Sequence, residues 1–360
     1  MIYTTPPRIQ RPVPQSMQAS VLTGVHEIRM EDRPVPTPAH DEVLVQVTAV
    51  GVCGSDAHYY REGRIGEYVV DGPLVLGHEA AGVIVAVGSD VSDARVGQRV
   101  SIEPQRPDPT SAQSRAGRYN LCPAMEFFAT PPIDGALAEY VLIQSVFAHD
   151  VPDSISDEAA ALFEPLSVGI ASAQKAGITA GSSVLIAGAG PVGIVTAQVA
   201  RAFGATEVIV SDIDAPRRDN AAKLGATRVL DPAVDDVRAL EVDAFIDASG
   251  AARAVVDGIH AVRPAGTVVL VGMGGSDYPL PISLIQNREL VLTGVFRYAN
   301  TWPIARELVL AGRVDLDAMV TARFGLDRVE DALNADKQPG SIKAVVIPGL
   351  SQSPSKETNV

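Results

Sequence analysis

Cysteine is scarce in this chain, which contains only Cys53 and Cys122 among 360 residues. Two cysteines cannot form the several bridges of a small secreted domain, so a disulfide framework is excluded. The sequence has no run of eighteen or more apolar residues, which argues against a membrane span. Residues 1–14 are polar and proline-rich and lack the apolar core of a signal peptide. These absences favour a cytoplasmic protein.

Positively charged residues are fewer than negatively charged ones. The chain has 29 Lys and Arg against 43 Asp and Glu, a formal net charge of −14. Nucleic acids and anionic membranes bind basic surfaces, so neither is expected as a partner. Hydrophobic residues make up 46% and charged residues 20%, as in ordinary globular proteins. A chain of this length is expected to form two domains.

The first part of the chain is predicted to be rich in β-strands. Between about residues 17 and 144, short runs of β-branched residues alternate with Gly and Pro, at 42–47, 82–88, 97–102 and 138–143. This pattern predicts an antiparallel, partly closed barrel. The segment 105–135 has no periodicity, and loops of this length are usually functional or pinned by other contacts.

Strand-like and helix-like segments then alternate from about residue 182 to 296. The strand-like runs lie at 184–187, 207–212, 243–247, 267–272 and 290–294. Their alternation with helices predicts a parallel, doubly wound sheet. A helix-like segment at 303–312 and a strand-like run at 342–347 follow. We therefore predict an α/β protein, with a nucleotide-binding domain at 163–298 and a β-rich catalytic domain formed by residues 1–162 and 299–360.

A glycine fingerprint follows the run at 184–187 and opens a helix-like segment. Its residues are Gly188, Gly190, Pro191, Val192 and Gly193. In such a loop the first glycine allows a tight turn, the second lets the backbone approach a pyrophosphate, and the third permits close helix–strand packing. The helix N-terminus offers free N–H groups to the phosphates. This context predicts a dinucleotide site.

Asp212 follows the fingerprint at the end of the next predicted strand. There its carboxylate can accept hydrogen bonds from the ribose hydroxyls of NAD. Its negative charge would repel the 2′-phosphate of NADP. NAD is therefore favoured over NADP. Arg217 either packs its guanidinium on the adenine or is a solvated helix charge.

One thiol, one imidazole and two carboxylates form a candidate zinc site. These are Cys53, His78, Glu79 and Glu164. Cys53 is expected in a loop after a strand, His78 and Glu79 in a loop before a strand, and Glu164 near the junction of the two lobes. Zinc binds these donor types, and a catalytic site keeps one position open. Together with the fingerprint, they predict zinc-assisted hydride transfer to or from a nicotinamide.

From about residue 17 to 348 the chain resembles the zinc-dependent medium-chain dehydrogenases, and within them the sorbitol and xylitol dehydrogenases. The resemblance is carried by the glycine fingerprint and by the motifs Gly77-His78-Glu79, Phe163-Glu164-Pro165, Ala129-Thr130-Pro131-Pro132 and Phe296-Arg297-Tyr298. It implies a GroES-like catalytic domain, a Rossmann domain, and oxidation of a sugar alcohol to a ketose with NAD.

The resemblance also implies roles for individual residues. Cys53, His78 and one of Glu79 or Glu164 would ligate the catalytic zinc, with the other carboxylate acting through the metal-bound water. Ser55 would pass on the alcohol proton, and His58 would form the outer end of that relay. The implied substrate-binding residues are Tyr59, Phe127, Arg297 and Tyr298. Further implied cofactor contacts are Val271, Gly272, Phe296 and Arg297.

The chain departs from its relatives in the long loop. Many of them bind a structural zinc there through four cysteines, whereas this sequence has Asp108, Ser111 and Ser114 before Cys122. One thiolate cannot build that site. We therefore expect one catalytic zinc per subunit, no structural zinc, and a loop held by packing alone.

Two other functions are also consistent with the sequence. One is an NAD-dependent dehydrogenase of another secondary alcohol, such as threonine or butanediol. The other is a cofactor-binding protein without catalysis, which the presence of the zinc ligands disfavours. Relatives form dimers or tetramers, so a homo-oligomer is expected. The apolar run 289–296 is either an edge strand suited to such pairing or a buried interior strand.

Overall fold

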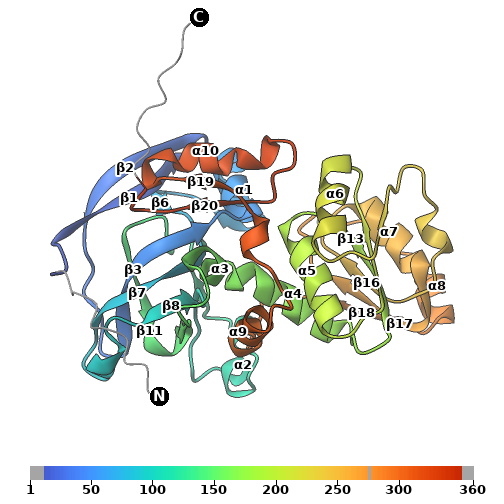
Figure 1. Cartoon of the computed structure of the whole chain (residues 1–360), viewed down its shortest axis with the longest axis horizontal. Helices are drawn as coiled ribbons and strands as arrows, with labels where there is room; N and C mark the ends of the chain where they lie inside the picture. Colours follow the sequence, from blue (N-terminus) through green and yellow to red (C-terminus); the bar gives the residue numbers. More distant parts are fainter. Residues whose placement is uncertain (1–11, 275–276, 351–360) are drawn as a thin grey trace, which may run out of the picture.

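The computed structural model describes residues 12–274 and 277–350. Two lobes lie along the long axis of the molecule, with α4 (Phe163–Lys175) where they meet (Figure 1). Most of the polar segment 1–14 lies outside the described residues. Within the described ranges, no helix is long and apolar enough to cross a membrane.

The larger sheet of the first lobe has seven strands in the order β12-β8-β7-β3-β20-β19, with β11 also paired to β3. The strands are β3 (Glu42–Gly51), β7 (Glu79–Val87), β8 (Arg99–Ile102), β11 (Tyr140–Gln144), β12 (Ala148–Asp150), β19 (Val320–Phe324) and β20 (Lys343–Val346). Its pairs are antiparallel except β19 with β20. Because β20 pairs with β3, the chain end returns beside the strand that leads to Cys53.

A smaller sheet of the same lobe joins β1 (Ser16–Gly24), β2 (Glu27–Pro34) and β6 (Leu74–Val75). Helices α3 (Asp157–Ala161), α9 (Trp302–Leu310) and α10 (Val329–Leu333) also belong to this lobe (Figure 1). The segment 303–312 is thus helical over most of its length, as predicted.

The second lobe is a six-stranded sheet in the order β15-β14-β13-β16-β17-β18. The strands are β13 (Ser183–Ala187), β14 (Glu207–Ser211), β15 (Arg228–Leu230), β16 (Val242–Asp247), β17 (Val262–Leu270) and β18 (Val291–Gly294). Every pair is parallel. In chain order this is 3-2-1-4-5-6, the doubly wound order whose ligand crevice opens between β13 and β16. The predicted parallel sheet is confirmed.

Helices cover both faces of this sheet, which explains its nearly continuous apolar strands. They are α5 (Pro191–Ala202), α6 (Ala215–Lys223), α7 (Ala252–Ala261) and α8 (Ile282–Asn287) (Figure 1). Val184, Leu185 and Ile186 in the central strand are fully buried. The domain limits given above stay a prediction.

The apolar run 289–296 forms an edge strand. It contains β18, which is the last strand of the six-stranded sheet. Val291 is 56% exposed, Leu292 37% and Phe296 51%. The interior-strand alternative is therefore wrong, because the sheet ends at β18.

Candidate active site

Three of the four candidate zinc ligands converge. A ligand atom from each of Cys53, His78 and Glu79 lies within 4.8 Å of the other two. Cys53 caps α1 (Gly54–Glu62), His78 directly precedes β7, and Glu79 begins that strand. We had expected Cys53 in one loop and His78 with Glu79 in another. The structure differs in two respects, because a helix begins directly after Cys53 and Glu79 already belongs to strand β7. One sulfur, one nitrogen and one oxygen atom gathered at this spacing are the donor types that zinc binds.

Lys343 is the buried partner of Glu79. Its Nζ lies 2.6 Å from Glu79 Oε1 and 3.0 Å from the carbonyl oxygen of Val52. The other oxygen, Glu79 Oε2, is buried and accepts no hydrogen bond from the described residues. A cation held with Cys53 and His78 would give this oxygen a partner, so the donor set fits zinc. Sequence reasoning missed Lys343, although a lone lysine in the apolar run 342–347 was a signal.

Asp56 is a second residue that the sequence analysis missed. Its carboxylate accepts the backbone N–H of Cys53 at 3.0 Å and of Gly77 at 2.9 Å, and lies 3.6 Å from His78 Nδ1. It thereby connects the two segments that carry ligands and orients the imidazole. The signal was an acidic residue three positions after the helix cap, as in a capping box.

The charge around His78 favours a cation. Burial alone would lower the pKa of His78, but the negative charges of Asp56 and Cys53 raise it well above its usual value. The same negative charge would stabilise a divalent ion in place of the imidazolium proton.

Glu164 lies beside these three residues without joining their group. It is in the first turn of α4, and its Oε1 accepts a 2.7 Å hydrogen bond from the hydroxyl of Tyr298. Burial raises the pKa of Glu164 to about 7; the charge of His78 opposes this rise, and that of Glu79 adds to it. The structure thus places both carboxylates near His78, with Glu79 nearer to the other ligand atoms.

The candidate substrate-binding side chains gather next to His78. The ring centroids of Phe127 and His78 are 5.6 Å apart, and the guanidinium of Arg297 lies 3.8 Å from the Phe127 centroid. Tyr59 is buried on α1, and burial raises its pKa to about 12, with the charge of Tyr68 contributing further. A guanidinium on an aromatic face combines a cation–π contact with free N–H donors.

Ser55 and His58 both lie on α1. Ser55 is half-buried, and His58, three residues further on, is exposed. Residues at this spacing share one helix face. The His58 Nδ1 atom lies 3.5 Å from Glu62 Oε1, and among the described residues no hydrogen bond joins Ser55 to His58. The proton relay stays a prediction.

The glycine fingerprint adopts the geometry that a dinucleotide loop needs. Gly188 has a φ of 98°, and a Cβ on Gly193 would fall 1.8 Å from the carbonyl oxygen of Gly188. Gly190 caps α5, and a Cβ there would meet no atom within 4 Å, so the space before the helix is open. Pro191 and Val192 begin the helix.

The other candidate cofactor residues lie at the same edge of the sheet or on α6. Asp212 follows β14, and its Oδ2 accepts the N–H of Ala189 in the fingerprint at 2.8 Å. Val271 and Gly272 follow β17. Arg217 is exposed on α6.

The four positions in the long loop still lie together. Cys122 Sγ accepts the N–H of Asp108 at 3.3 Å, and the Ser111 and Ser114 hydroxyls are 2.9 Å apart. Burial raises the pKa of Cys122, but hydrogen bonds from Ser111 and Ser114 and from the backbone lower it overall. The expectation that packing alone holds the loop is wrong, because these polar groups bond to one another.

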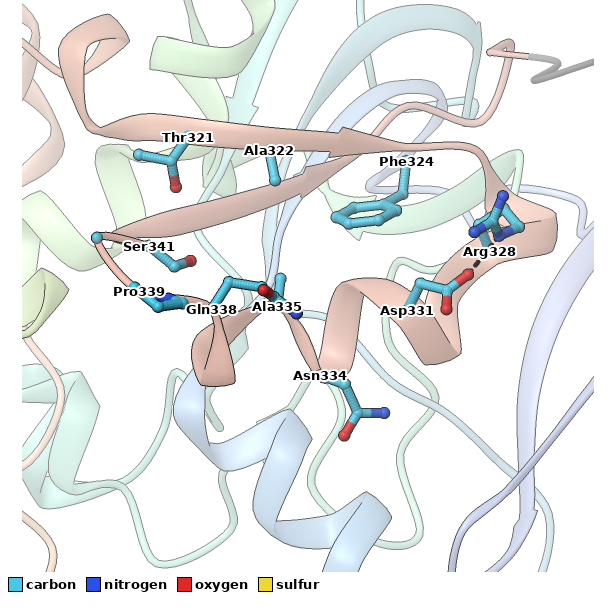
Figure 2. A pocket seen from close by; sticks show the side chains of 11 residues that line it. Thr321, Ala322, Phe324, Arg328, Asp331, Asn334, Ala335, Gln338, Pro339 and Ser341 are labelled. Carbon is cyan, nitrogen blue, oxygen red and sulfur yellow. Dashed lines mark hydrogen bonds and ion pairs between the residues drawn. The ribbon is translucent and has the colours of Figure 1, made fainter. Parts of the chain in front are cut away.

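A pocket of about 600 Å³ lies elsewhere, between β19 and α10 (Figure 2). None of the candidate site residues lines it. Arg328 and Asp331 in its wall form an ion pair, and the Asn334 amide donates to the carbonyl oxygen of Glu330 at 2.9 Å. Arg328, Asp331 and Asn334 are thus already engaged with the protein.

Two family models match the chain. "Alcohol dehydrogenase GroES-like domain" matches residues 39–153, and "Zinc-binding dehydrogenase" matches residues 191–311. The chain belongs to the zinc-binding alcohol dehydrogenases. This confirms the predicted GroES-like and Rossmann architecture.

Several relatives of this zinc-binding dehydrogenase have names that describe their activity. Sorbitol dehydrogenase of Bacillus subtilis is 42% identical over 330 residues, covering 89% of this chain and 94% of that protein. "Probable D-xylulose reductase A" of Neosartorya fischeri is 42% identical over 341 residues, covering 91% and 95%. A solved alcohol dehydrogenase of Escherichia coli CFT073, complexed with NADH, has a TM-score of 0.87 at 26% identity, covering 93% of this chain and all of that one. The protein is an oxidoreductase of a zinc- and nucleotide-dependent family.

Proposed function

We propose that this protein oxidises a sugar alcohol to the ketose, transferring hydride to NAD with the help of one zinc ion. The observation that carries the proposal is the convergence of Cys53, His78 and Glu79 beside Arg297, in a chain 42% identical to a sorbitol dehydrogenase. An arginine with five N–H donors suits a chain of hydroxyl groups better than a simple alcohol.

Cys53, His78 and Glu79 would hold the zinc, with Glu164 beside it. When bound, the metal supplies a Lewis acid that lowers the pKa of a substrate hydroxyl. Asp56 orients the imidazole of His78, and Lys343 balances the charge of Glu79.

The remaining residues bind the substrate and move its proton. Ser55, half-buried in the first turn of α1, would accept the substrate's hydroxyl proton as it gives up its own, and His58 would deliver a proton to solvent. Arg297 binds hydroxyl groups further along the substrate, with its guanidinium supported by Phe127. Tyr298 holds Glu164 in place through its hydroxyl.

NAD is the proposed cofactor because Asp212 lies where the adenosine ribose would bind. We expect Asp212→Asn to lower the ratio of kcat/KM for NAD over NADP by roughly tenfold or more, since hydrogen bonds to a charged group contribute about 1.5–3 kcal/mol. The single oxygen of asparagine can still accept the N–H of Ala189, but the N–H of Asp214, which now donates to Asp212 Oδ1 at 2.9 Å, loses its acceptor. Steady-state kinetics with both cofactors measures the ratio. An unchanged ratio in Asp212→Asn would contradict the assignment.

The exposed edge strand supports a homo-oligomer. Among the described strands β18 pairs on one side only, with β17, and it exposes the apolar side chains of Val291 and Leu292. Edges of this kind invite pairing with another chain. We propose that two copies pair through this edge.

A substrate panel tests the proposed reaction. NADH formation should be faster with sorbitol and xylitol than with threonine, butanediol or ethanol. Turnover of threonine or butanediol alone would retain the dehydrogenase and overturn the polyol assignment.

A further inference from the structure

A buried carboxylate outside the proposed site organises a second cluster of polar side chains. Glu103, just after β8, is 1% exposed. Its Oε1 accepts from Gln105 Nε2 at 3.1 Å and from the Tyr119 hydroxyl at 2.8 Å, and its Oε2 lies 2.9 Å from His149 Nε2. A buried carboxylate is stable only where donors replace its lost hydration. We call these four residues the Glu103 cluster.

Two members of the Glu103 cluster also hold the backbone of residues 298–300. Gln105 Nε2 donates to the carbonyl oxygen of Tyr298 at 3.1 Å. The Tyr119 hydroxyl accepts the N–H of Asn300 at 2.7 Å. The same two side chains therefore link one buried carboxylate to both ends of this short segment.

The segment ends, and the residue directly before it lies, in the left-handed region of backbone conformation. Arg297 has a φ of 56° and Asn300 a φ of 60°. The left-handed region is tolerated by asparagine but is uncommon for arginine. Such conformations persist where the surrounding structure determines them, and they concentrate at functional sites. Gln105 and Tyr119 share this role with two other contacts, from Asn120 Nδ2 to the carbonyl oxygen of Phe296 at 2.8 Å and from Asn300 Nδ2 to the carbonyl oxygen of Gly117 at 3.0 Å.

The segment and Arg297, the residue directly before it, carry side chains on which the proposed site depends. Tyr298 donates its hydroxyl to Glu164, and the guanidinium of Arg297 lies over Phe127. Phe127 is itself paired in register with Gln105, between β9 (Gln105–Arg106) and β10 (Glu126–Phe127). The Glu103 cluster thus reaches the site both through the 298–300 backbone and through a strand pair.

We propose that Glu103, Gln105 and Tyr119 are positioning residues for substrate recognition, which fix Arg297 and Tyr298 against Phe127 and Glu164. They do not touch the reacting atoms. The kinetic part of this inference rests on the proposed polyol oxidation. A displacement of about 1 Å at a site can cost a hundredfold in rate, so loss of these contacts should be measurable.

Gln105→Leu and Tyr119→Phe are the test variants, each of similar size to the residue it replaces. For each we expect the KM for sorbitol to rise about tenfold or more, while the zinc content stays at the wild-type value and the KM for NAD rises much less than that for sorbitol. A residue that only stabilised the fold would not separate the two KM values.

His149→Phe is the matched control. It removes a hydrogen bond to the same carboxylate but keeps a ring against Trp302, whose centroid lies 5.5 Å from that of His149. Among the described residues, His149 makes no hydrogen bond to the segment 298–300. The KM of the His149→Phe variant for sorbitol should therefore stay within about twofold of wild type. An equal rise in all three variants, or no rise in the first two, overturns the proposal.

Hydrogen exchange provides a readout that does not need turnover. Peptides covering residues 297–302 should exchange faster in Gln105→Leu and Tyr119→Phe than in wild type or His149→Phe. Unchanged exchange in the first two variants overturns the positioning role. A wild-type protein that oxidises no polyol would contradict the proposed function instead, and the exchange result would still decide whether the cluster fixes this segment.

Discussion

Replacing Cys53 with alanine should remove the bound zinc and lower kcat/KM for a polyol by at least about a thousandfold. Cys53 is the thiol of the proposed site, and two remaining ligands would bind zinc weakly. Zinc lowers the pKa of bound water from about 15.7 to about 7, which corresponds to roughly 11–12 kcal/mol. Loss of half of this effect, about 6 kcal/mol, exceeds a thousandfold in rate. Metal analysis and steady-state kinetics measure the two losses.

Cys122→Ser provides the matched control. Cys122 is the other cysteine of the chain, is buried, and accepts a hydrogen bond from the N–H of Asp108. A serine oxygen can accept the same bond, so zinc content and kcat/KM should stay within about twofold of wild type. Wild-type zinc content and turnover in Cys53→Ala, or equal losses in both variants, would contradict the metal assignment.

Lys343→Met should destabilise the zinc-free protein strongly. Both members of the Lys343–Glu79 pair are at most 2% exposed. Removing one partner of a buried ion pair costs about 3–5 kcal/mol, because the other charge remains buried. Zinc bound to Glu79 would neutralise the same charge, so the loss of unfolding free energy should be much smaller with zinc. Urea unfolding with and without the metal measures the difference.

The double variant Lys343→Met/Glu79→Gln separates charge from packing. It removes the unpaired carboxylate, so the zinc-free double variant should be more stable than zinc-free Lys343→Met. Equal destabilisation of Lys343→Met with and without zinc would mean that the metal does not neutralise Glu79. That result would favour Glu164 as the direct ligand.

The nucleotide-binding half could be predicted from the sequence because its signals are local. Apolar runs gave the central strands, and Gly188, Gly190 and Gly193 indicated the turn whose open conformation the structure shows. The spacing of the fingerprint to Asp212 also indicated two neighbouring strand ends, which lie together because parallel strands align.

The catalytic half was less predictable because its key contacts join distant parts of the chain. Lys343 and Glu79 are 264 positions apart, and Gln105 and Tyr298 are 193 apart. No local sequence pattern predicts contacts between residues so far apart in the chain. The helix after Cys53 was missed because its sequence is polar and has no clear apolar periodicity.

Stepwise restoration of zinc tests whether polyol oxidation by this protein depends on one zinc ion per chain. Zinc would be removed with a chelator and added back while NADH formation from sorbitol is measured. We predict almost no activity without metal, and a linear recovery that ends at one zinc per chain. Full activity in the metal-free protein, or no activity with sorbitol at any zinc content, would contradict this prediction.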